Sequence, residues 1–133
     1  MFRKVTKRTL QLATLCAALA ERVAGCAQVD SFDDIQNAIA SSLPNEVVLL
    51  CPFSVVRGDE NAVGLPVRQN GVKVICAKDK VDDKCEIKGE ARHLEIMGDG
   101  VTVLGFDFIG SKKGAIAVIN GRGTSIIDCN FQE

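Results

Sequence analysis

Two aspartates occupy similar places in two related segments near the end of the chain. Asp107 lies within residues 106–108, and Asp128 lies within residues 126–131. Carboxylates gathered on one solvent-facing surface can hold calcium or accept hydrogen bonds from sugar hydroxyls. We therefore take Asp107 and Asp128 as candidate ligand-binding residues on one face of the fold. The alternative is that both carboxylates are simply solvated or stabilise turns.

The other residues that could do chemistry form no recognisable catalytic motif. His93 is the only histidine and has no serine or cysteine partner marked by a local motif. We expect it to be an exposed residue at the entrance of a strand. The cysteines lack the paired CxxC spacing of a zinc site. We accordingly predict no catalytic residue, no cofactor and no metal site in this chain.

The composition excludes some classes of partner. Sixteen basic and seventeen acidic residues leave a net charge of −1, and no basic cluster with interleaved aromatic residues follows the first eight residues. We therefore expect no nucleic-acid binding, which depends on such clusters. The chain has six Phe but neither Trp nor Tyr, so the usual stacking platforms for sugars and bases are missing. A length of 133 residues, 47% of them hydrophobic, suits a single domain with its own core.

The first 27 residues are typical of a secretion signal. A basic start is followed by a largely apolar stretch from Leu10 to Ala20, and residues 25–27, Gly-Cys-Ala, give a small-x-small pattern. We expect cleavage after Ala27, a folded part spanning residues 28–133, and an extracellular location. The apolar stretch is too short to span a bilayer, so no membrane span is expected.

Three other interpretations of this first segment stay open. Residues 23–26, Val-Ala-Gly-Cys, resemble a bacterial lipobox, which would leave Cys26 as a lipidated N-terminus. The basic, acid-poor first 20 residues could instead be a mitochondrial transit peptide. The segment could also be an ordinary N-terminal helix.

The cysteines are consistent with export. Cleavage after Ala27 would leave Cys51, Cys76, Cys85 and Cys129, which allow three pairings. Cys76 and Cys85 flank a short, mostly polar segment, residues 77–84, whose composition gives no apolar reason for it to be ordered. We therefore name them as disulfide candidates in an oxidising compartment, where a bridge of this loop length would stabilise the fold by roughly 2–3 kcal/mol.

The hydrophobic pattern predicts one helix followed by β structure. Ser31 precedes Phe32, Ile35 and Ile39, whose spacing gives a helix with one apolar face, and Pro44 ends it. From residue 46 onward, short β-branched runs are separated by turn residues. These expected strands cover residues 47–50, 72–75, 94–96, 101–104, 116–119 and 125–127.

The β region contains an internal repeat. Residues 94–108 align without gaps with residues 117–131 at an offset of 23, so that Phe108 falls on Phe131. An earlier copy at residues 70–75 aligns with residues 99–104 at an offset of 29, the extra length lying between the two central cysteines. A β-solenoid has such a period, with one repeat per coil and apolar residues stacked inside. A β-sandwich is the alternative, but it requires no fixed period.

These segments resemble the right-handed parallel β-helix proteins of the pectin-lyase-like superfamily. The resemblance covers roughly Phe32 to Glu133 and rests on the leading helix, the first strand, residues 100–108 and their echo at residues 126–131. It implies an all-β parallel β-helix whose N-terminal end is capped by the amphipathic helix. Nothing after the last strand segment resembles a C-terminal cap. We therefore interpret the chain as the N-terminal portion of a truncated β-helix, with an open end available for self-association.

The same resemblance implies a link to polysaccharides. Enzymes of this superfamily act on acidic polysaccharides, using clustered aspartates that hold calcium beside a basic residue or aspartates that act as acid and base. Their hydrolase-type signatures, an Asp-Asp pair within a strand segment and Gly-His-Gly, are absent. We therefore predict a secreted, non-catalytic segment that binds carbohydrate or other extracellular matrix. Two alternatives stay open: the front of a lyase or hydrolase whose active site lies beyond Glu133, and a structural cell-surface protein.

Overall fold

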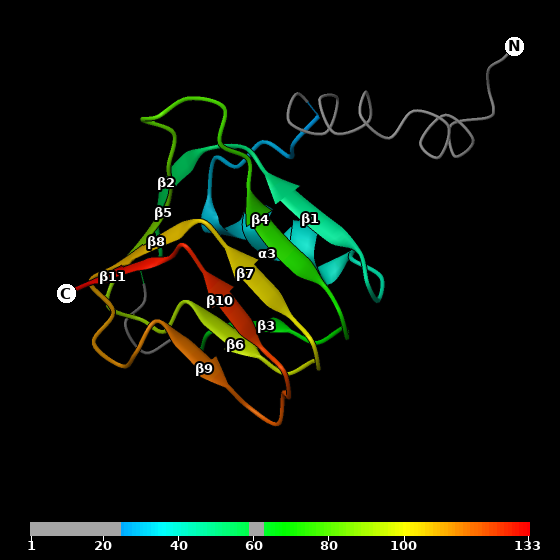
Figure 1. Ribbon diagram of the computed structural model, residues 1–133. Helices are drawn as coiled ribbons and strands as arrows, with labels where there is room; N and C mark the ends of the chain where they lie inside the picture. The colour runs from blue at the N-terminus through cyan, green and yellow to red at the C-terminus, as the bar shows by residue number, and fades with distance from the viewer. Residues whose placement is uncertain (1–24, 59–62) are drawn as a thin grey trace, which may run out of the picture.

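The chain folds into a β-solenoid. The computed structural model describes residues 25–58 and 63–133, which form one short helix and eleven strands. The strands pair only in parallel and build three sheets around a common core in about three turns (Figure 1). This confirms the predicted fold class, an all-β parallel β-helix with a leading helix.

Each of the first three coils contributes one strand to each sheet, and the last described strands, β10 and β11, extend the first two sheets. The first sheet has the order β1 (Val47–Leu50), β4 (Lys73–Cys76), β7 (Thr102–Leu104) and β10 (Ser125–Ile127). The second has the order β2 (Phe53–Val56), β5 (Cys85–Lys88), β8 (Phe106–Ile109) and β11 (Asn130–Gln132). The third has the order β3 (Leu65–Val67), β6 (Leu94–Ile96) and β9 (Ile116–Val118).

The register follows the predicted repeat in two of the three sheets. In the first sheet β10 pairs with β7 at an offset of 23, and in the second Phe131 pairs with Phe108 at the same offset. In the third sheet Ile96 pairs with Val118, so the expected alignment of Ile96 with Ile119 is wrong by one residue. The turn at residues 119–124 is one residue longer than its counterpart at residues 97–101, and this restores the register in the next strand.

The earlier coil also pairs as the sequence predicts. Lys73 lies opposite Thr102, which is the expected offset of 29. The additional length lies between β4 and β5, where the chain leaves the coil in a loop closed by a disulfide between Cys76 and Cys85. A long loop at one corner therefore does not disturb the stacking of the strands on either side of it.

The core is a set of inward-facing columns of apolar side chains. Burial alternates along the strands because successive side chains point to opposite faces of a sheet. In the second sheet the rings of Phe106 and Phe108 are 6.0 Å apart, and the ring of Phe131 stacks on Phe108 at 5.3 Å. The first contact lies within β8, and the second joins β8 to β11 of the next coil along the solenoid axis.

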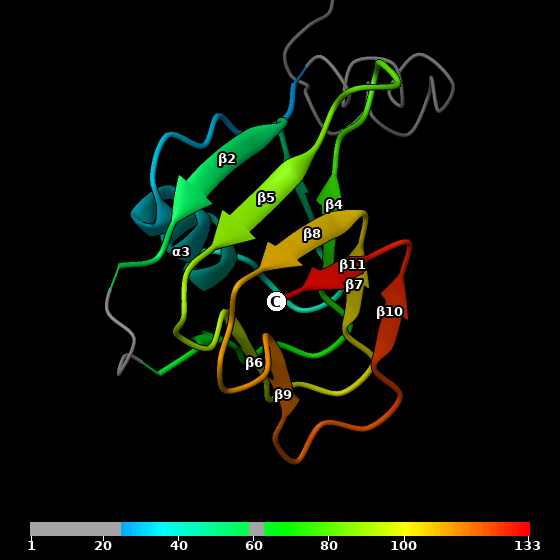
Figure 2. The same ribbon diagram turned by 90° about the vertical axis from the view of Figure 1, so that its left-hand side faces the viewer.

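Helix α3 (Phe32–Ala40) covers the N-terminal end of the solenoid. Its buried residues Phe32, Ile35 and Ile39 belong to the same core cluster as the strands. The Asp34 carboxylate accepts hydrogen bonds from the backbone N–H groups of Asp30 and Ser31, which fixes the first turn. Figure 2 shows α3 beside β2, at the opposite end of the second sheet from β11.

The opposite end of the solenoid is open. Strands β9, β10 and β11 each lie at the edge of their sheet in the described part of the chain. Val118, Ile126 and Phe131 are 48%, 41% and 55% exposed, although their counterparts one coil earlier are buried. The last coil therefore presents core-type side chains to solvent.

Five of the eleven described strands were not predicted from the sequence. They are β2, β3, β5, β8 and β11. Two of them carry proline at or beside the strand, Pro52 before β2 and Pro66 within β3, and proline normally argues against a strand. In β5 only alternate residues are apolar over four positions, which is too short a pattern to stand out.

Candidate functional site

The outer face of the second sheet carries a row of polar side chains in register. Ser54, Glu86, Asp107 and Asn130 are consecutive register partners on β2, β5, β8 and β11. Ser54, Glu86 and Asp107 alternate with inward-facing residues of their strands and point away from the core, and Asn130 continues the row on β11. We call these four residues the polar row. Neighbouring strands are about 4.8 Å apart, so the row offers polar groups at a regular spacing along the solenoid.

Asp107 is the most enclosed member of the polar row. It is only 7% exposed, and Nδ2 of Asn130 donates a hydrogen bond of 3.0 Å to Oδ1 of Asp107. Next to it, Oε1 of Glu86 lies 3.8 Å from Nζ of Lys88. Asp107 and Glu86 therefore each have a partner on the same face, and this partner holds the carboxylate in its orientation.

Asp128 does not join Asp107 in this row. It lies at the corner between β10 and β11, with a positive φ of 52°, and its side chain is exposed. One coil earlier the same corner is occupied by Gly105, with φ of 85°. Asparagine and aspartate tolerate this left-handed conformation better than other side-chain-bearing residues. The structure thus gives Asp128 a turn position, and the register partner of Asp107 is Asn130 instead.

A cleft adjoins the polar row where β5 and β8 end. Its volume is about 600 Å³, and its lining residues come from the ends of these strands, the turns that follow them and the last residue of the chain. They are Lys88, Gly89, Glu90, Ile109, Gly110, Ser111, Lys112 and Glu133.

Charged groups of both signs line the cleft, and so does a serine whose hydroxyl is enclosed. Nζ of Lys112 lies 3.1 Å from Oε2 of Glu90, and Lys88 reaches the cleft from the polar row. Oγ of Ser111 is buried and has no hydrogen-bond partner. A buried hydroxyl without a partner costs free energy, and a ligand in the cleft would bond to it only after the side chain turned toward the cleft.

His93 is buried, and the prediction of an exposed histidine is wrong. It has no exposed surface, and its ring stacks on Phe108 at 5.8 Å inside the solenoid. Its Nε2 lies 3.0 Å from the carbonyl oxygen of Gly89, so Nε2 carries the proton and donates to that oxygen. Burial disfavours the imidazolium form, and this lowers the pKa of His93 below its ordinary value of 6.5. The residue is part of the core.

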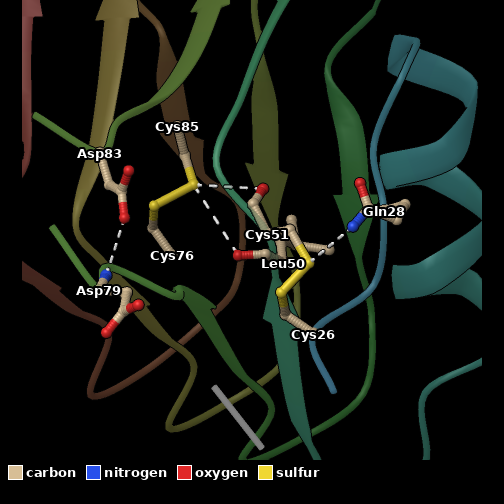
Figure 3. The surroundings of a disulfide bond; sticks show 8 residues. All are labelled: Cys26, Gln28, Leu50, Cys51, Cys76, Asp79, Asp83 and Cys85. Carbon is tan, nitrogen blue, oxygen red and sulfur yellow. Dashed lines mark hydrogen bonds between the residues drawn. A yellow bond between two sulfur atoms is a disulfide. The ribbon is translucent and has the colours of Figure 1, made fainter. Parts of the chain in front are cut away.

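Two disulfides lie at the corner between the first and second sheets. One joins Cys76 to Cys85, the candidate pair from the sequence, and the other joins Cys26 to Cys51. Figure 3 shows the two bridges close together, with Sγ of Cys85 3.8 Å from the carbonyl oxygen of Cys51. The Cys26 pairing could not be anticipated, because cleavage after Ala27 would have removed that cysteine.

The loop inside the Cys76–Cys85 bridge is ordered by one carboxylate. Asp83 accepts hydrogen bonds from the backbone N–H groups of Lys80 and Asp79, at 2.8 and 2.9 Å. These bonds favour the ionised form and lower the pKa of the Asp83 carboxyl. The loop is therefore held by two side-chain-to-backbone hydrogen bonds as well as by its disulfide.

Two other kinds of feature are absent from the described residues. Residues 25–58 and 63–133 contain no cluster of three or more histidine, cysteine or acidic residues able to hold a metal ion. No helix within the same ranges is long and apolar enough to cross a membrane. Cys129 has a free thiol near the open end of the solenoid.

Comparisons with known proteins gave no relative. No model of a known protein family matches the chain, and searches of curated proteins and of solved structures found no match either. The fold is therefore established by the sheets themselves.

The sequence pointed to only part of this site. Asp107 was singled out, but Glu86, Asn130 and Ser111 were not. The signal for Glu86 was the alternation of apolar and polar residues in Cys85–Lys88, which marks a half-buried strand. Nothing in the sequence marks Ser111, because the cleft forms only when two successive coils stack.

Proposed function

We propose that the chain is a secreted, non-catalytic β-solenoid that binds polysaccharide through the polar row and the adjoining cleft. The observation that carries this proposal is the continuity of the two features: four register partners lead to a cleft lined by Lys88, Lys112 and Ser111. A polysaccharide is a linear ligand with repeating hydroxyl groups, and it suits a linear surface with repeating hydrogen-bonding groups.

The chemistry of the surface favours hydrogen bonding over ring stacking. Lys88 and Asn130 supply donors, Glu86 and Asp107 supply acceptors, and the chain has no Trp or Tyr on which a sugar ring could stack. Acceptors and donors of this kind exchange bonds with water at little net gain, so we expect weak binding that grows with the length of the polysaccharide.

Export and family membership belong to the same proposal. Two disulfides are typical of proteins from oxidising compartments, which supports an extracellular location. The parallel solenoid and its leading helix support membership of the pectin-lyase-like superfamily. Of the predicted leader, residues 1–24 lie outside the described residues.

The binding proposal can be tested with surface variants of the exported chain. In pull-down assays with a panel of insoluble polysaccharides, we expect retention of the wild type and at least tenfold weaker binding of the Lys88→Ala, Ser111→Ala double variant. This estimate assumes about 1.5 kcal/mol for the lost bonds to ligand. Lys73→Ala is the matched control, because Lys73 is exposed on β4, in a different sheet. Background retention of the wild type, or equal losses in the control, would refute the proposal.

We also propose that the open end of the solenoid associates with a second copy. The exposed core-type residues Val118, Ile126 and Phe131 lie beside unpaired strand edges, and exposed edges of this kind favour pairing with another chain. Sedimentation velocity should show a concentration-dependent dimer that Phe131→Glu abolishes. Val81→Glu is the control, since Val81 is fully exposed in the disulfide-closed loop. A wild-type protein that stays monomeric at every concentration would contradict this proposal.

A further inference from the structure

Residues 26–29 are built into the solenoid. Cys26 forms a disulfide with Cys51, and Ala27 pairs in parallel with Leu50 on the N-terminal edge of the first sheet. The backbone N–H of Ala27 donates to Leu49 at 2.8 Å, and that of Cys51 donates to the carbonyl of Ala27 at 2.9 Å. Close by, Val29 is 7% exposed and belongs to the core. The described fold thus begins before the expected cleavage position.

Cleavage after Ala27 would damage this arrangement. It would remove Cys26 and leave Cys51, which is only 6% exposed, with a buried unpaired thiol. It would also remove the two hydrogen bonds that Ala27 makes to the edge of β1. Lipidation at Cys26 meets the same obstacle, because a thioether and a disulfide cannot form on one sulfur atom.

The sequence contains a second cleavage pattern that preserves the disulfide. Ala18-Leu19-Ala20 is a small-x-small motif directly after the apolar stretch at residues 10–17, and the charged pair Glu21-Arg22 follows it. We infer that the leader is removed after Ala20, so that the mature chain begins at Glu21 and keeps Cys26 for its disulfide with Cys51. The disulfide in the structure is the evidence that Cys26 is retained, and the sequence motif is the evidence for the position of the cut.

The inferred maturation has two covalent steps, hydrolysis of one peptide bond and formation of one disulfide. A signal peptidase hydrolyses the bond between Ala20 and Glu21, and one water yields a carboxyl group on Ala20 and an amino group on Glu21. Cys26 and Cys51 then lose two protons and two electrons to an oxidised thiol–disulfide oxidoreductase of the secretory compartment, whose own disulfide becomes a dithiol.

This inference rests on the proposed export, and one experiment separates the two. The full chain is expressed in a secretory host, and the exported product is examined by N-terminal sequencing and by intact mass after alkylation, with and without reduction. We expect a start at Glu21, one alkylated cysteine before reduction, which is Cys129, and five after it. Digestion at Glu46 without reduction should leave the peptides carrying Cys26 and Cys51 linked.

Each other outcome has a distinct meaning. A product that begins at Gln28, with two cysteines alkylated before reduction and four after it, would overturn the inference while leaving export intact. A product that begins at a lipid-modified Cys26 would overturn it too. Full-length chain retained inside the cell would refute both the inference and the proposed export.

A matched pair of variants tests the position of the cut directly. Ala20→Leu places a bulky residue at the inferred site and should cause the uncleaved precursor to accumulate several-fold. Ala27→Leu should be processed like the wild type, because Ala27 is exposed and contributes only backbone hydrogen bonds to the sheet. The reverse pattern would show that cleavage follows Ala27 instead.

Discussion

Replacement of Phe108 by alanine should be one of the most damaging single changes in this fold. The side chain is 1% exposed and contacts aromatic rings on three sides: Phe106 at 6.0 Å, His93 at 5.8 Å and Phe131 at 5.3 Å. Truncation of a buried phenylalanine removes its transfer free energy and leaves a cavity, which together cost about 3–5 kcal/mol. We expect Phe108→Ala near the upper end of this range, because stacked neighbours in adjacent coils cannot collapse into the gap.

Phe131→Ala is the control from the same column. Phe131 is 55% exposed, so only about half of its apolar surface is withdrawn from water, and the substitution should cost about 1 kcal/mol. Urea unfolding of the disulfide-intact protein, followed by far-UV circular dichroism, measures both values. Fluorescence does not serve, because the chain has no Trp or Tyr. Equal costs at low protein concentration would refute this account of the core, whereas a Phe131 cost that rises with concentration would reveal the dimer proposed above.

Three further changes probe other parts of the fold. His93 is buried and neutral in the folded state, so as the pH falls below about 6.5 the unfolded chain binds a proton there before the folded one does, and the fold loses stability. His93→Gln should remove this loss. Unfolding free energies measured at several pH values check this, and an unchanged slope would contradict it. The double variant Cys76→Ala, Cys85→Ala should lose about 2.5 kcal/mol in urea unfolding, from the freed loop. Gly98→Ala should lose about 1–3 kcal/mol, because the added carbon meets backbone carbonyls of the preceding coil, while Gly58→Ala, which meets nothing, should be neutral in the same assay.

The architecture was predictable because stacking leaves a periodic record in the sequence. The alignment of Phe108 with Phe131 follows from the fact that equivalent positions in successive coils form one column. The helix was predictable from Phe32, Ile35 and Ile39 for the same reason, since one buried face dictates their spacing. The one-residue error in the third sheet arose where two turns differ in length, because an exposed turn can gain a residue at little cost.

The functional surface was less predictable because it depends on which coils become neighbours. Asp107 and Asn130 are 23 residues apart, and the repeat at that offset already aligned them, but the alignment did not show that their side chains share the outer face of one sheet and bond to each other. His93 was misplaced because its immediate neighbours, Arg92 and Leu94, do not reveal that its ring packs on Phe108 of β8 inside the solenoid. The residues next to His93 in the sequence therefore led to the wrong prediction that its side chain is exposed.

The stabilising features of this solenoid are concentrated at one end, and this bears on the proposed binding surface. Helix α3 and both disulfides secure the first two coils, whereas β9, β10 and β11 have one unpaired edge each in the described structure. In a solenoid each coil contacts only its neighbours, so stability gained at one end reaches the other only through the intervening interfaces. The polar row crosses this gradient from Ser54 to Asn130. A ligand bound along the whole row would therefore tie the least stable coil to the most stable one, and would stabilise the fold beyond the contacts it makes at any single strand.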